Sequence, residues 1–343
     1  MRAPTPTPVF DTFWRFAAER QRVFYARIER PTAPLGWSTD PIILAHKFTC
    51  PYRAADRTSQ VLIRRVIYGN DKAAPADVVF KTLLFKFFNK IETWDLLAAR
   101  FGEISWRTFS TDRYDAVLAE AMAHGQAIFS SAYIMPTGAG EFSSARKHLN
   151  FLQLLHRMMA DRLPDRLLDA HSLSAIYELL LGYPLLGRFL SFQLTVDLLY
   201  SPLLPWDEND FVVAGPGALS GIAKCFSDQA GLTPAEIIRW TTERQDGEFE
   251  RRGLDFKGLW GRPLHLIDVQ NLFCEVNKYS RVAHPDVAGA DGRTKIKQAF
   301  RPTRSQINYW FPPKWGINGL VPAIADELQA PAIDQRPIQG TLF

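Results

Sequence analysis

Cysteine is scarce in this sequence. Three cysteines occur in 343 residues, Cys50, Cys225 and Cys274, and they lie far apart in the chain. An odd number of widely spaced thiols predicts neither a disulfide framework nor the Cys/His spacing of a zinc or iron–sulfur site. We therefore expect reduced thiols and a protein that uses no metal and no cofactor.

Long apolar runs and a secretion signal are also missing. No apolar run approaches the roughly 18 residues that a membrane-spanning helix needs, although 47% of the residues are hydrophobic. The chain begins with a proline-rich stretch, residues 4–8, in place of the charged and then apolar segment of a signal peptide. These features predict a globular, cytoplasmic protein without a membrane partner.

Positive charge exceeds negative charge only slightly. The sequence has 40 lysine and arginine residues against 36 aspartate and glutamate residues, for a net charge of +4, which is compatible with a polyanionic partner but does not demand one. The densest group of cations, with no acidic residue among them, is Arg293, Lys295, Lys297 and Arg301. Phosphate contacts by this segment would be independent of base sequence and sensitive to salt. We expect it to bind DNA; the alternative is an ordinary basic surface.

Helical periodicity dominates the chain. Residues 10–30, 75–90 and 264–282 carry apolar side chains at helical spacing, and no strands alternate with the helices. The sequence therefore predicts a mainly α protein, which we expect to be a monomer. Its expected organisation is a disordered tail (1–9), a single helical domain (10–320) in two lobes of about 10–180 and 181–320, and a C-terminal tail (321–343).

Polar side chains line one face of the helix predicted at 264–282. Four of them recur at three- and four-residue steps, namely Asp268, Asn271, Glu275 and Tyr279. Burying carboxylates costs several kcal/mol unless they are paired or hydrogen-bonded, so this face is a candidate site with Asp268 as its main carboxylate. The alternative is a structural network, in which Asp268 caps the helix N-terminus and Glu275 pairs with a nearby basic residue.

A second polar pair lies within residues 182–201. Gln193 and Asp197 stand one turn apart in an otherwise apolar helix. A carboxylate among so many apolar side chains is either a tightly hydrogen-bonded structural residue or part of a site, and the pattern leaves both interpretations open.

Three glycines punctuate residues 211–226. Gly215, Gly217 and Gly221 resemble a dinucleotide-binding turn, but that turn needs a βαβ unit, which this helical chain does not provide. A helix–hairpin–helix turn is the second interpretation, because its backbone N–H groups can face a DNA phosphate, and Lys224 would reinforce the contact. The third is a plain turn between helices.

The order of hairpin, helix and an Asp that opens another helix resembles the helix–hairpin–helix DNA glycosylases. The resemblance implies that residues 214–221 grip the DNA backbone and that Asp268 stabilises positive charge on the sugar as a flipped-out base leaves. Leu219 stands where bifunctional members carry a lysine, which implies a hydrolase without lyase activity. Another register places the hairpin at 182–187, with the essential carboxylate at Asp197, Asp207 or Asp210.

A broader resemblance covers most of the chain. The strings FTCPYRAADR, LLFKFFNKIETW, IFSSAYIMP, GRFLSFQLTVDLLYS, FVVAGPGALSGIAKCF and LIDVQNLFCEVNKYSRV are similar to the helical family of DNA base hypermodification. That family includes hydroxymethyluracil-DNA kinase helical domains and α-glutamyl/putrescinyl-thymine pyrophosphorylases. The resemblance implies a glycosylase-like helical fold that acts on modified pyrimidines in DNA. Some members help to install thymine modifications, and others excise bulky bases in anti-phage defence.

Excision is the function that we expect first. The chain would be a monofunctional DNA glycosylase that removes hypermodified pyrimidines, such as glucosylated hydroxymethylcytosine, from double-stranded phage DNA and leaves abasic sites. A glycosylase needs a carboxylate near the anomeric carbon, because its transition state resembles an oxocarbenium ion. The predicted site comprises catalytic Asp268, Asn271, Glu275 and Asp197, substrate-binding Gln193 and Tyr279, and DNA-binding Gly215, Gly217, Lys224, Arg293, Lys295, Lys297 and Arg301.

Two alternatives come from other classes. A thymine hypermodification transferase would displace pyrophosphate from activated hydroxymethyluracil in DNA, and its carboxylate would deprotonate the incoming nucleophile. A non-catalytic reader would bind modified DNA without changing it. Loss of chemistry but not of binding on alanine substitution at Asp268 or Asp197 would distinguish an enzyme from a reader.

Overall fold

Helices make up nearly all the regular structure of the chain. The computed structural model contains fourteen α-helices and one two-stranded sheet in its described residues, so the predicted mainly α fold is confirmed. None of the helices in this part of the chain has the length and apolar character to cross a membrane. The described residues are 2–31, 36–131, 135–138, 140–289, 292–301 and 307–322.

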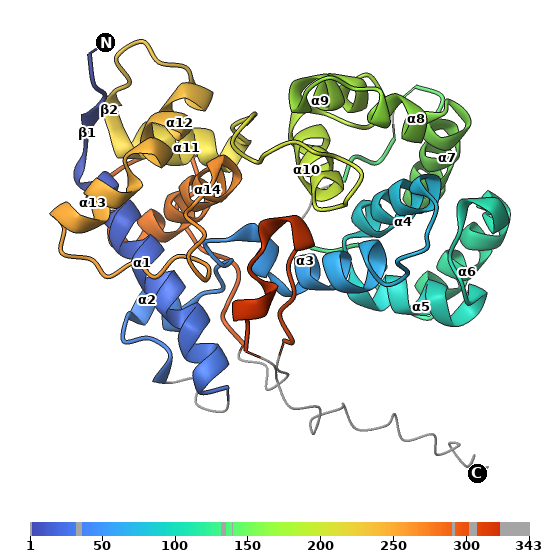
Figure 1. Cartoon of the computed structure of the whole chain (residues 1–343), viewed down its shortest axis with the longest axis horizontal. Helices are drawn as coiled ribbons and strands as arrows, with labels where there is room; N and C mark the ends of the chain where they lie inside the picture. The colour runs from blue at the N-terminus through green and yellow to red at the C-terminus, as the bar shows by residue number, and fades with distance from the viewer. Residues whose placement is uncertain are drawn as a thin grey trace.

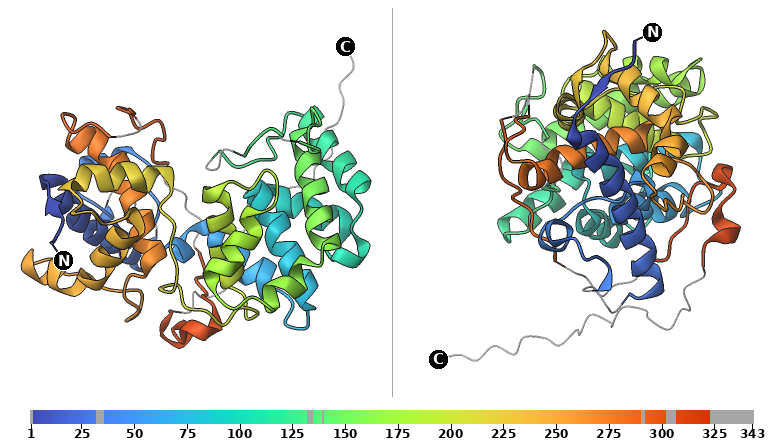
Figure 2. Two further views of the ribbon diagram at one scale, coloured as in Figure 1. Left: turned by 90° about the horizontal axis from the view of Figure 1, so that it is seen from above. Right: turned by 90° about the vertical axis from the view of Figure 1, so that its left-hand side faces the viewer.

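Two groups of helices lie side by side (Figures 1 and 2). The first, which we call the terminal lobe, packs α14 against α1, α2, α11 and α12, with α13 beside α12. Its apolar centre includes Phe13 of α1, whose ring lies 4.6 Å from that of Phe273 of α14. The bounds of these helices are α1 (Pro8–Glu29), α2 (Pro41–Ala45), α11 (Pro216–Cys225), α12 (Pro234–Glu243), α13 (Gln245–Arg251) and α14 (Leu266–Ala283).

The second group, which we call the central lobe, is built around α4. Every residue of α4 from Val78 to Phe88 is buried, because α7, α8 and α10 pack on it, and α5 and α6 complete the lobe. The bounds are α4 (Pro75–Phe88), α5 (Ile91–Phe101), α6 (Thr111–Ala123), α7 (Lys147–Ala160), α8 (Leu163–Leu168), α9 (Leu173–Leu181) and α10 (Arg188–Leu199).

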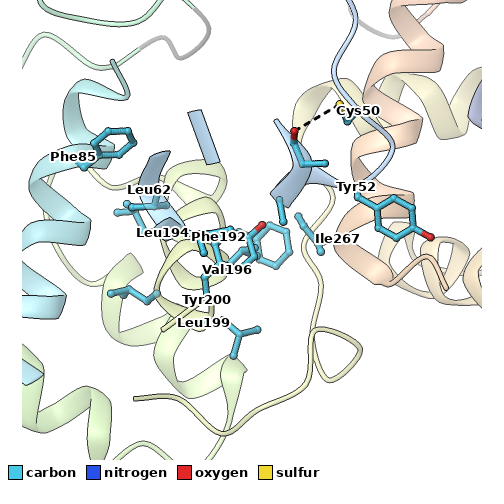
Figure 3. Close-up of a cluster of buried hydrophobic side chains, with 14 of the residues drawn as sticks. Cys50, Tyr52, Leu62, Phe85, Phe192, Leu194, Val196, Leu199, Tyr200 and Ile267 are labelled. Atoms are coloured by element: carbon cyan, nitrogen blue, oxygen red, sulfur yellow. Dashed lines mark hydrogen bonds between the residues drawn. The ribbon is translucent and has the colours of Figure 1, made fainter. Parts of the chain in front are cut away.

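The junction between the lobes is formed by the segments that cross it. The short helix α3 (Arg57–Val61) continues as a π-helical turn, η3 (Leu62–Ile67), which packs on α4. Apolar side chains gather there from several elements, including Leu62 of η3, Phe85 of α4, Phe192 of α10 and Ile267 of α14 (Figure 3). The side chains that lie between the lobes are therefore held on both sides by packed helices.

The lobes do not follow the boundary that we predicted near residue 180. Helix α1 packs with α11 and α14, near the other end of the chain, whereas α10 packs on α4 and α9. Apolar periodicity indicates where a helix lies but does not say which distant helix covers its apolar face. The single domain itself stays a prediction.

The two predicted tails have different outcomes. Residues 2–9 are not a disordered tail: β1 (Thr5–Pro6) pairs antiparallel with β2 (Phe226–Asp228). Thr7 then caps α1 by accepting a hydrogen bond from the N–H of Val9, and its Oγ1 donates to the carbonyl of Lys224 over 2.5 Å. Most of the predicted C-terminal tail, residues 323–343, lies outside the described residues.

Candidate functional site

Arg53 is the central residue of a buried polar network between the lobes. It lies in the short 3-10 turn η2 (Arg53–Ala55), and its side chain is 7% exposed. The guanidinium donates from Nη1 to Oδ1 of Asp197 over 2.7 Å and to Oη of Tyr200 over 3.2 Å, and from Nε to Oε1 of Gln193 over 3.0 Å. All three partners lie at α10, so this side chain attaches the crossing segment to the central lobe.

Asp197 is completely buried, and two cations compensate its charge. Besides Arg53, Nζ of Lys86 lies 3.3 Å from Oδ2 of Asp197. A buried carboxylate with two cationic partners avoids the cost of an uncompensated charge. The sequence left open whether Asp197 is a structural residue or part of a site. These contacts are the ones expected of a tightly hydrogen-bonded structural residue.

The backbone of Arg53 reaches the terminal lobe. Its N–H donates to Oδ1 of Asp268 over 3.2 Å, and the N–H of His265 donates to Oδ2 over 3.1 Å. His265 is the N-cap of α14, so Asp268 belongs to a capping box. Burial, and then the nearby charge of Glu208, raise the pKa of Asp268 above its usual range.

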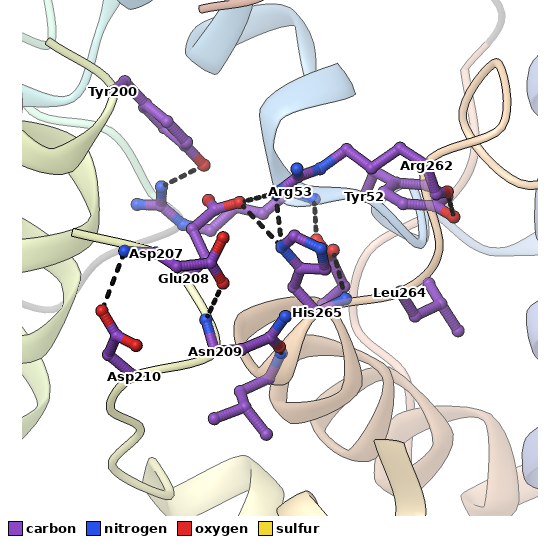
Figure 4. Close-up of polar contacts among 12 residues, drawn as sticks. Tyr52, Arg53, Tyr200, Asp207, Glu208, Asn209, Asp210, Arg262, Leu264 and His265 are labelled. Atoms are coloured by element: carbon purple, nitrogen blue, oxygen red, sulfur yellow. Dashed lines mark hydrogen bonds and ion pairs between the residues drawn. The ribbon is translucent and has the colours of Figure 1, made fainter. Parts of the chain in front are cut away.

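Glu208 forms the third part of the network. It lies in the segment between α10 and α11, is 6% exposed, and accepts a hydrogen bond from Arg262. Nδ1 of His265 lies 3.5 Å from the same carboxylate oxygen and 2.5 Å from Nη2 of Arg262. Figure 4 shows these three side chains converging beside Arg53. A carboxylate, an imidazole and guanidinium groups can together accept a proton and stabilise negative charge.

The other polar residues of α14 lie away from this network. Asn271 donates to the carbonyl of Cys50 over 3.0 Å, and Tyr279 donates to Oδ2 of Asp40 over 2.7 Å. Glu275 accepts from the N–H of Thr49 over 2.9 Å, and it also pairs with the lysine one turn later, Lys278. The predicted polar face therefore exists, but Asn271, Glu275 and Tyr279 fasten residues 40–50 to α14. These are the contacts of the structural alternative.

The predicted hairpin glycines are packing residues. A Cβ at Gly215 would lie 2.9 Å from the ring of Phe189, one at Gly217 would lie 3.1 Å from Sγ of Cys274, and one at Gly221 would lie 2.1 Å from the Phe273 carbonyl oxygen. The small size of Gly217 and Gly221 lets α11 cross closely over α14, and Gly215 lets the start of α11 lie against Phe189 of α10.

Lys224 also differs from its predicted place. Its side chain is buried, with 1% of the residue exposed, and Nζ donates to the carbonyl of Asn277 over 3.3 Å. The DNA-binding prediction for this residue is corrected on that ground, because an ammonium group enclosed between helices does not face a phosphate in solvent.

The predicted basic segment is exposed and held in place. The backbone of residues 292–301 runs beside α2: Lys47 N–H donates to Gln298 O, and Phe300 N–H donates to Ala45 O, each over 3.0 Å. All four predicted DNA-binding side chains are exposed: Arg293, Lys295, Lys297 and Arg301. Their role in DNA binding stays a prediction.

Comparison with known proteins gives the family. The family model described as "5-hmdU DNA kinase, helical domain" matches residues 7–289. The chain belongs to this family. A similar protein is the 5-hmdU DNA kinase of Bacillus phage SP10, with 24% identity over 294 residues, which cover 80% of this chain and 45% of the relative. The chain thus spans less than half of that relative's length. No solved structure matches.

Family membership corrects the expected activity. The resemblance to the hydroxymethyluracil-DNA kinase helical family is confirmed, whereas the predicted glycosylase, and with it a hydrolase that leaves abasic sites, is wrong: the similar phage protein is named a DNA kinase. The relationship to helix–hairpin–helix glycosylases stays a prediction. Residue chemistry did not separate these activities, because base excision and base modification both call for a carboxylate and for cations near DNA.

Six residues of the network were not among our site predictions: Arg53, Lys86, Tyr200, Glu208, Arg262 and His265. Arg53 and Glu208 stand in short polar clusters of the sequence, Tyr52–Arg57 and Asp207–Asp210. Such clusters are common on solvated loops, so they carried no signal strong enough to choose them. Their partners are distant in sequence: Arg53 meets Asp197 across 144 positions.

Proposed function

We propose that this chain acts in the hypermodification of thymine in DNA, on 5-hydroxymethyluracil whose hydroxyl group has been activated as a pyrophosphate ester. The match to the helical domain of 5-hmdU DNA kinases over residues 7–289 carries the proposal. Double-stranded DNA containing the modified base is the proposed partner. The match is to a helical domain and to less than half of the phage protein, so the kinase activity in that protein's name need not lie in the matched part. The first candidate is therefore a reaction on the base after its activation.

The proposed reaction is a substitution at the exocyclic methylene carbon. An amine forms the new C–N bond, the C–O bond breaks, and pyrophosphate leaves with the electron pair of that bond. The amine nitrogen then gives up one proton, which requires an acceptor, and the leaving group requires positive charge. Glu208, paired with His265, is the proposed acceptor, and Arg262 is the proposed cation (Figure 4).

Asp268 and Asp197, the carboxylates predicted first, have supporting roles in this proposal. Backbone N–H groups hold both oxygens of Asp268, and Arg53 and Lys86 hold those of Asp197. Each carboxylate anchors Arg53 to one lobe. Gln193 is proposed to act with Asp197, because both accept from the same guanidinium.

Phosphorylation of the hydroxymethyl group is the second candidate, favoured by the name of the phage relative. In that reaction the hydroxyl oxygen attacks the terminal phosphorus of a nucleoside triphosphate, the bond to the diphosphate breaks, and the hydroxyl proton passes to a base. Glu208 would then be the base. The two candidate reactions need different second substrates: an amine for the substitution and a nucleoside triphosphate for the phosphorylation.

A nucleoside mass analysis tests both candidates. The purified chain is incubated with duplexes that contain hydroxymethyluracil plus ATP, and with duplexes that contain pyrophosphorylated hydroxymethyluracil plus an amine. Gain of the amine with loss of pyrophosphate supports substitution, and gain of phosphate supports the kinase. Absence of chemistry together with preferential binding of modified duplexes would make the chain a reader. Absence of chemistry and of any preference over thymine DNA would overturn the proposal.

Glu208→Gln is expected to slow either reaction about a hundredfold or more, since a positioned acid or base contributes that much. The change keeps the shape of the side chain and its bond from Arg262. The measurement is the initial rate of product nucleoside formation. Asp210→Asn, in the same segment, is the control, because Asp210 is exposed and accepts from the backbone N–H of Asp207. Equal rates for Glu208→Gln and the native chain would remove Glu208 from the mechanism.

The exposed basic segment is the proposed DNA-binding surface. Replacing Lys295, Lys297 and Arg301 together by glutamine is expected to weaken binding to all duplexes alike. It should also reduce the slope of log affinity against log salt by about 1 for each phosphate that the variant no longer neutralises. Fluorescence anisotropy at several salt concentrations measures both quantities.

A matched variant separates this surface from net charge. Arg239, Arg244 and Arg251 are three exposed cations at α12 and α13, and their replacement by glutamine removes the same charge. We expect this control to keep the native salt slope. Equal losses in the two triple variants would mean that total charge, and not the segment at 292–301, attracts the DNA.

A further inference from the structure

Residues 307–322, which we call the strap, lie between the two lobes. The strap follows the part of the chain that the family model matches, residues 7–289. It contains the short 3-10 turns η5 (Pro313–Trp315) and η6 (Asn318–Leu320) and passes in front of α3 as the red segment of Figure 1. Although it has little regular structure, Phe311 is completely buried.

Aromatic side chains attach the strap to the terminal lobe. The ring of Tyr309 lies 5.0 Å from that of Phe24 of α1, and the ring of Phe311 lies 5.7 Å from that of Trp260. Aromatic pairs at such distances attract each other beyond the effect of the area that they bury, so these contacts hold the strap on the terminal lobe.

The strap also holds the central lobe and its connections. The N–H of Trp310 donates to Oε1 of Gln60 in α3 over 2.8 Å, and its ring lies 4.9 Å from that of Tyr68. Nζ of Lys314 donates to the carbonyl of Leu204, just after α10, over 2.9 Å. The Lys314 side chain is exposed overall, but its ammonium group is desolvated there, which lowers its pKa to about 8.

Trp315 connects the strap to the candidate site. The guanidinium carbon of Arg262 lies 3.9 Å from the centre of the Trp315 ring, and the ring of Tyr200 lies 6.0 Å away in a T-shaped contact. Arg262 belongs to the Glu208 part of the network, and Tyr200 belongs to the Arg53 part. A guanidinium against an indole face is an attractive contact that restricts the arginine.

We propose that the strap clamps the two lobes together and that Trp315 is a positioning residue, which holds Arg262 against Glu208. The clamp follows from aromatic anchors on both lobes, and the positioning role follows from the Trp315 contact with Arg262. The positioning role rests on the proposed function of the site. The clamp does not, and it is tested without DNA or substrate.

Distances between dyes on the two lobes test the clamp. Glu120 of α6 and Glu243 of α12 are exposed, so cysteines at these positions accept dyes, in a background where the half-buried Cys274 is alanine. Single-molecule energy transfer is expected to give one narrow distance distribution for the otherwise native chain. Trp315→Leu should broaden it or shift it to longer distances, and Trp315→Phe, which keeps an aromatic ring, should restore most of it.

Trp106→Leu is the control for loss of an indole. Trp106 packs within the central lobe, 5.9 Å from Phe80 and 5.5 Å from His156, so its loss should leave the dye distance unchanged. An unaltered distribution in Trp315→Leu, with circular dichroism showing that the chain is folded, would overturn the clamp.

Hydrogen exchange tests the positioning role. In Trp315→Leu, the amides of residues 259–268 and 204–210 are expected to exchange about tenfold faster, which corresponds to about 1.4 kcal/mol, while α4 and α7 keep their native rates. Unchanged exchange at 259–268 would show that Trp315 does not restrain Arg262. With an active chain, the variant should also lower the turnover number more than the affinity for DNA. Failure of that assay alone would count against the proposed reaction and not against the clamp.

Discussion

Replacing Arg53 by methionine is expected to lower the free energy of unfolding by about 3–5 kcal/mol, the cost of breaking a buried ion pair by removing one partner. Asp197 is completely buried and would keep Lys86 as its charged partner, and Tyr200 and Gln193 would lose a donor. Chemical denaturation followed by circular dichroism measures the change. The lost stability comes from the junction of the lobes, because the three hydrogen bonds of the Arg53 side chain join η2 to α10.

The same substitution at a surface ion pair is the matched control. Arg157 is about half exposed and bonds Asp161 one turn away in the chain, so Arg157→Met is expected to cost far less stability than Arg53→Met. The triple variant of Arg53→Met, Lys86→Met and Asp197→Leu should recover part of the loss, because the buried charges of the group are then removed together. A cost near that of Arg157→Met for Arg53→Met alone would show that the buried pair does not form in solution.

The helices could be predicted from the sequence because their signal is local. Residues 10–30 were expected to be helical and α1 spans Pro8–Glu29; 75–90 corresponds to α4, Pro75–Phe88, and 264–282 corresponds to α14, Leu266–Ala283. Apolar spacing and prolines at the first turns are properties of neighbouring residues. The predicted polar face of α14 exists for the same reason.

The partners of those helices could not be predicted, because they depend on contacts between distant residues. Spacing placed Glu275 and Asn271 on one face with Asp268, but only the folded chain shows that residues 49 and 50 occupy that face. The glycines of α11 show the same limit. A glycine that meets a phosphate and a glycine that meets another helix have the same sequence pattern, and the Phe273 carbonyl decides between them.

The residues alone could not decide between the candidate activities. The residues indicated DNA chemistry that uses a carboxylate and cations, which is common to excision and to modification at a hydroxymethyl group. The family match overturns excision and supports our proposal of modification. The structure adds the Arg53 network, whose members come from four separate parts of the chain: residue 53, residue 86, residues 193–208 and residues 262–268.

Gly221→Ala is expected to destabilise the terminal lobe by about 1–3 kcal/mol or more, the usual cost of forcing extra volume into a packed core. The new Cβ would lie 2.1 Å from the carbonyl oxygen and 2.8 Å from the carbonyl carbon of Phe273. Both atoms are backbone, so no side-chain rotation relieves the clash, and α11 must move away from α14. Thermal and chemical unfolding measure the loss.

Two other glycines make the test specific. A Cβ at Gly247 of α13 meets no atom within 4 Å, so Gly247→Ala should stabilise its helix by about 0.5–1 kcal/mol. A Cβ at Gly217 would meet the Cys274 side chain at 3.1 Å, where a small shift suffices, so Gly217→Ala should cost less than Gly221→Ala. The expected order of stability is therefore Gly247→Ala, native, Gly217→Ala and Gly221→Ala. If Gly221→Ala were as stable as the native chain, α11 and α14 would not approach this closely. Because Asp268 lies in the first turn of α14, its position would then need revision as well.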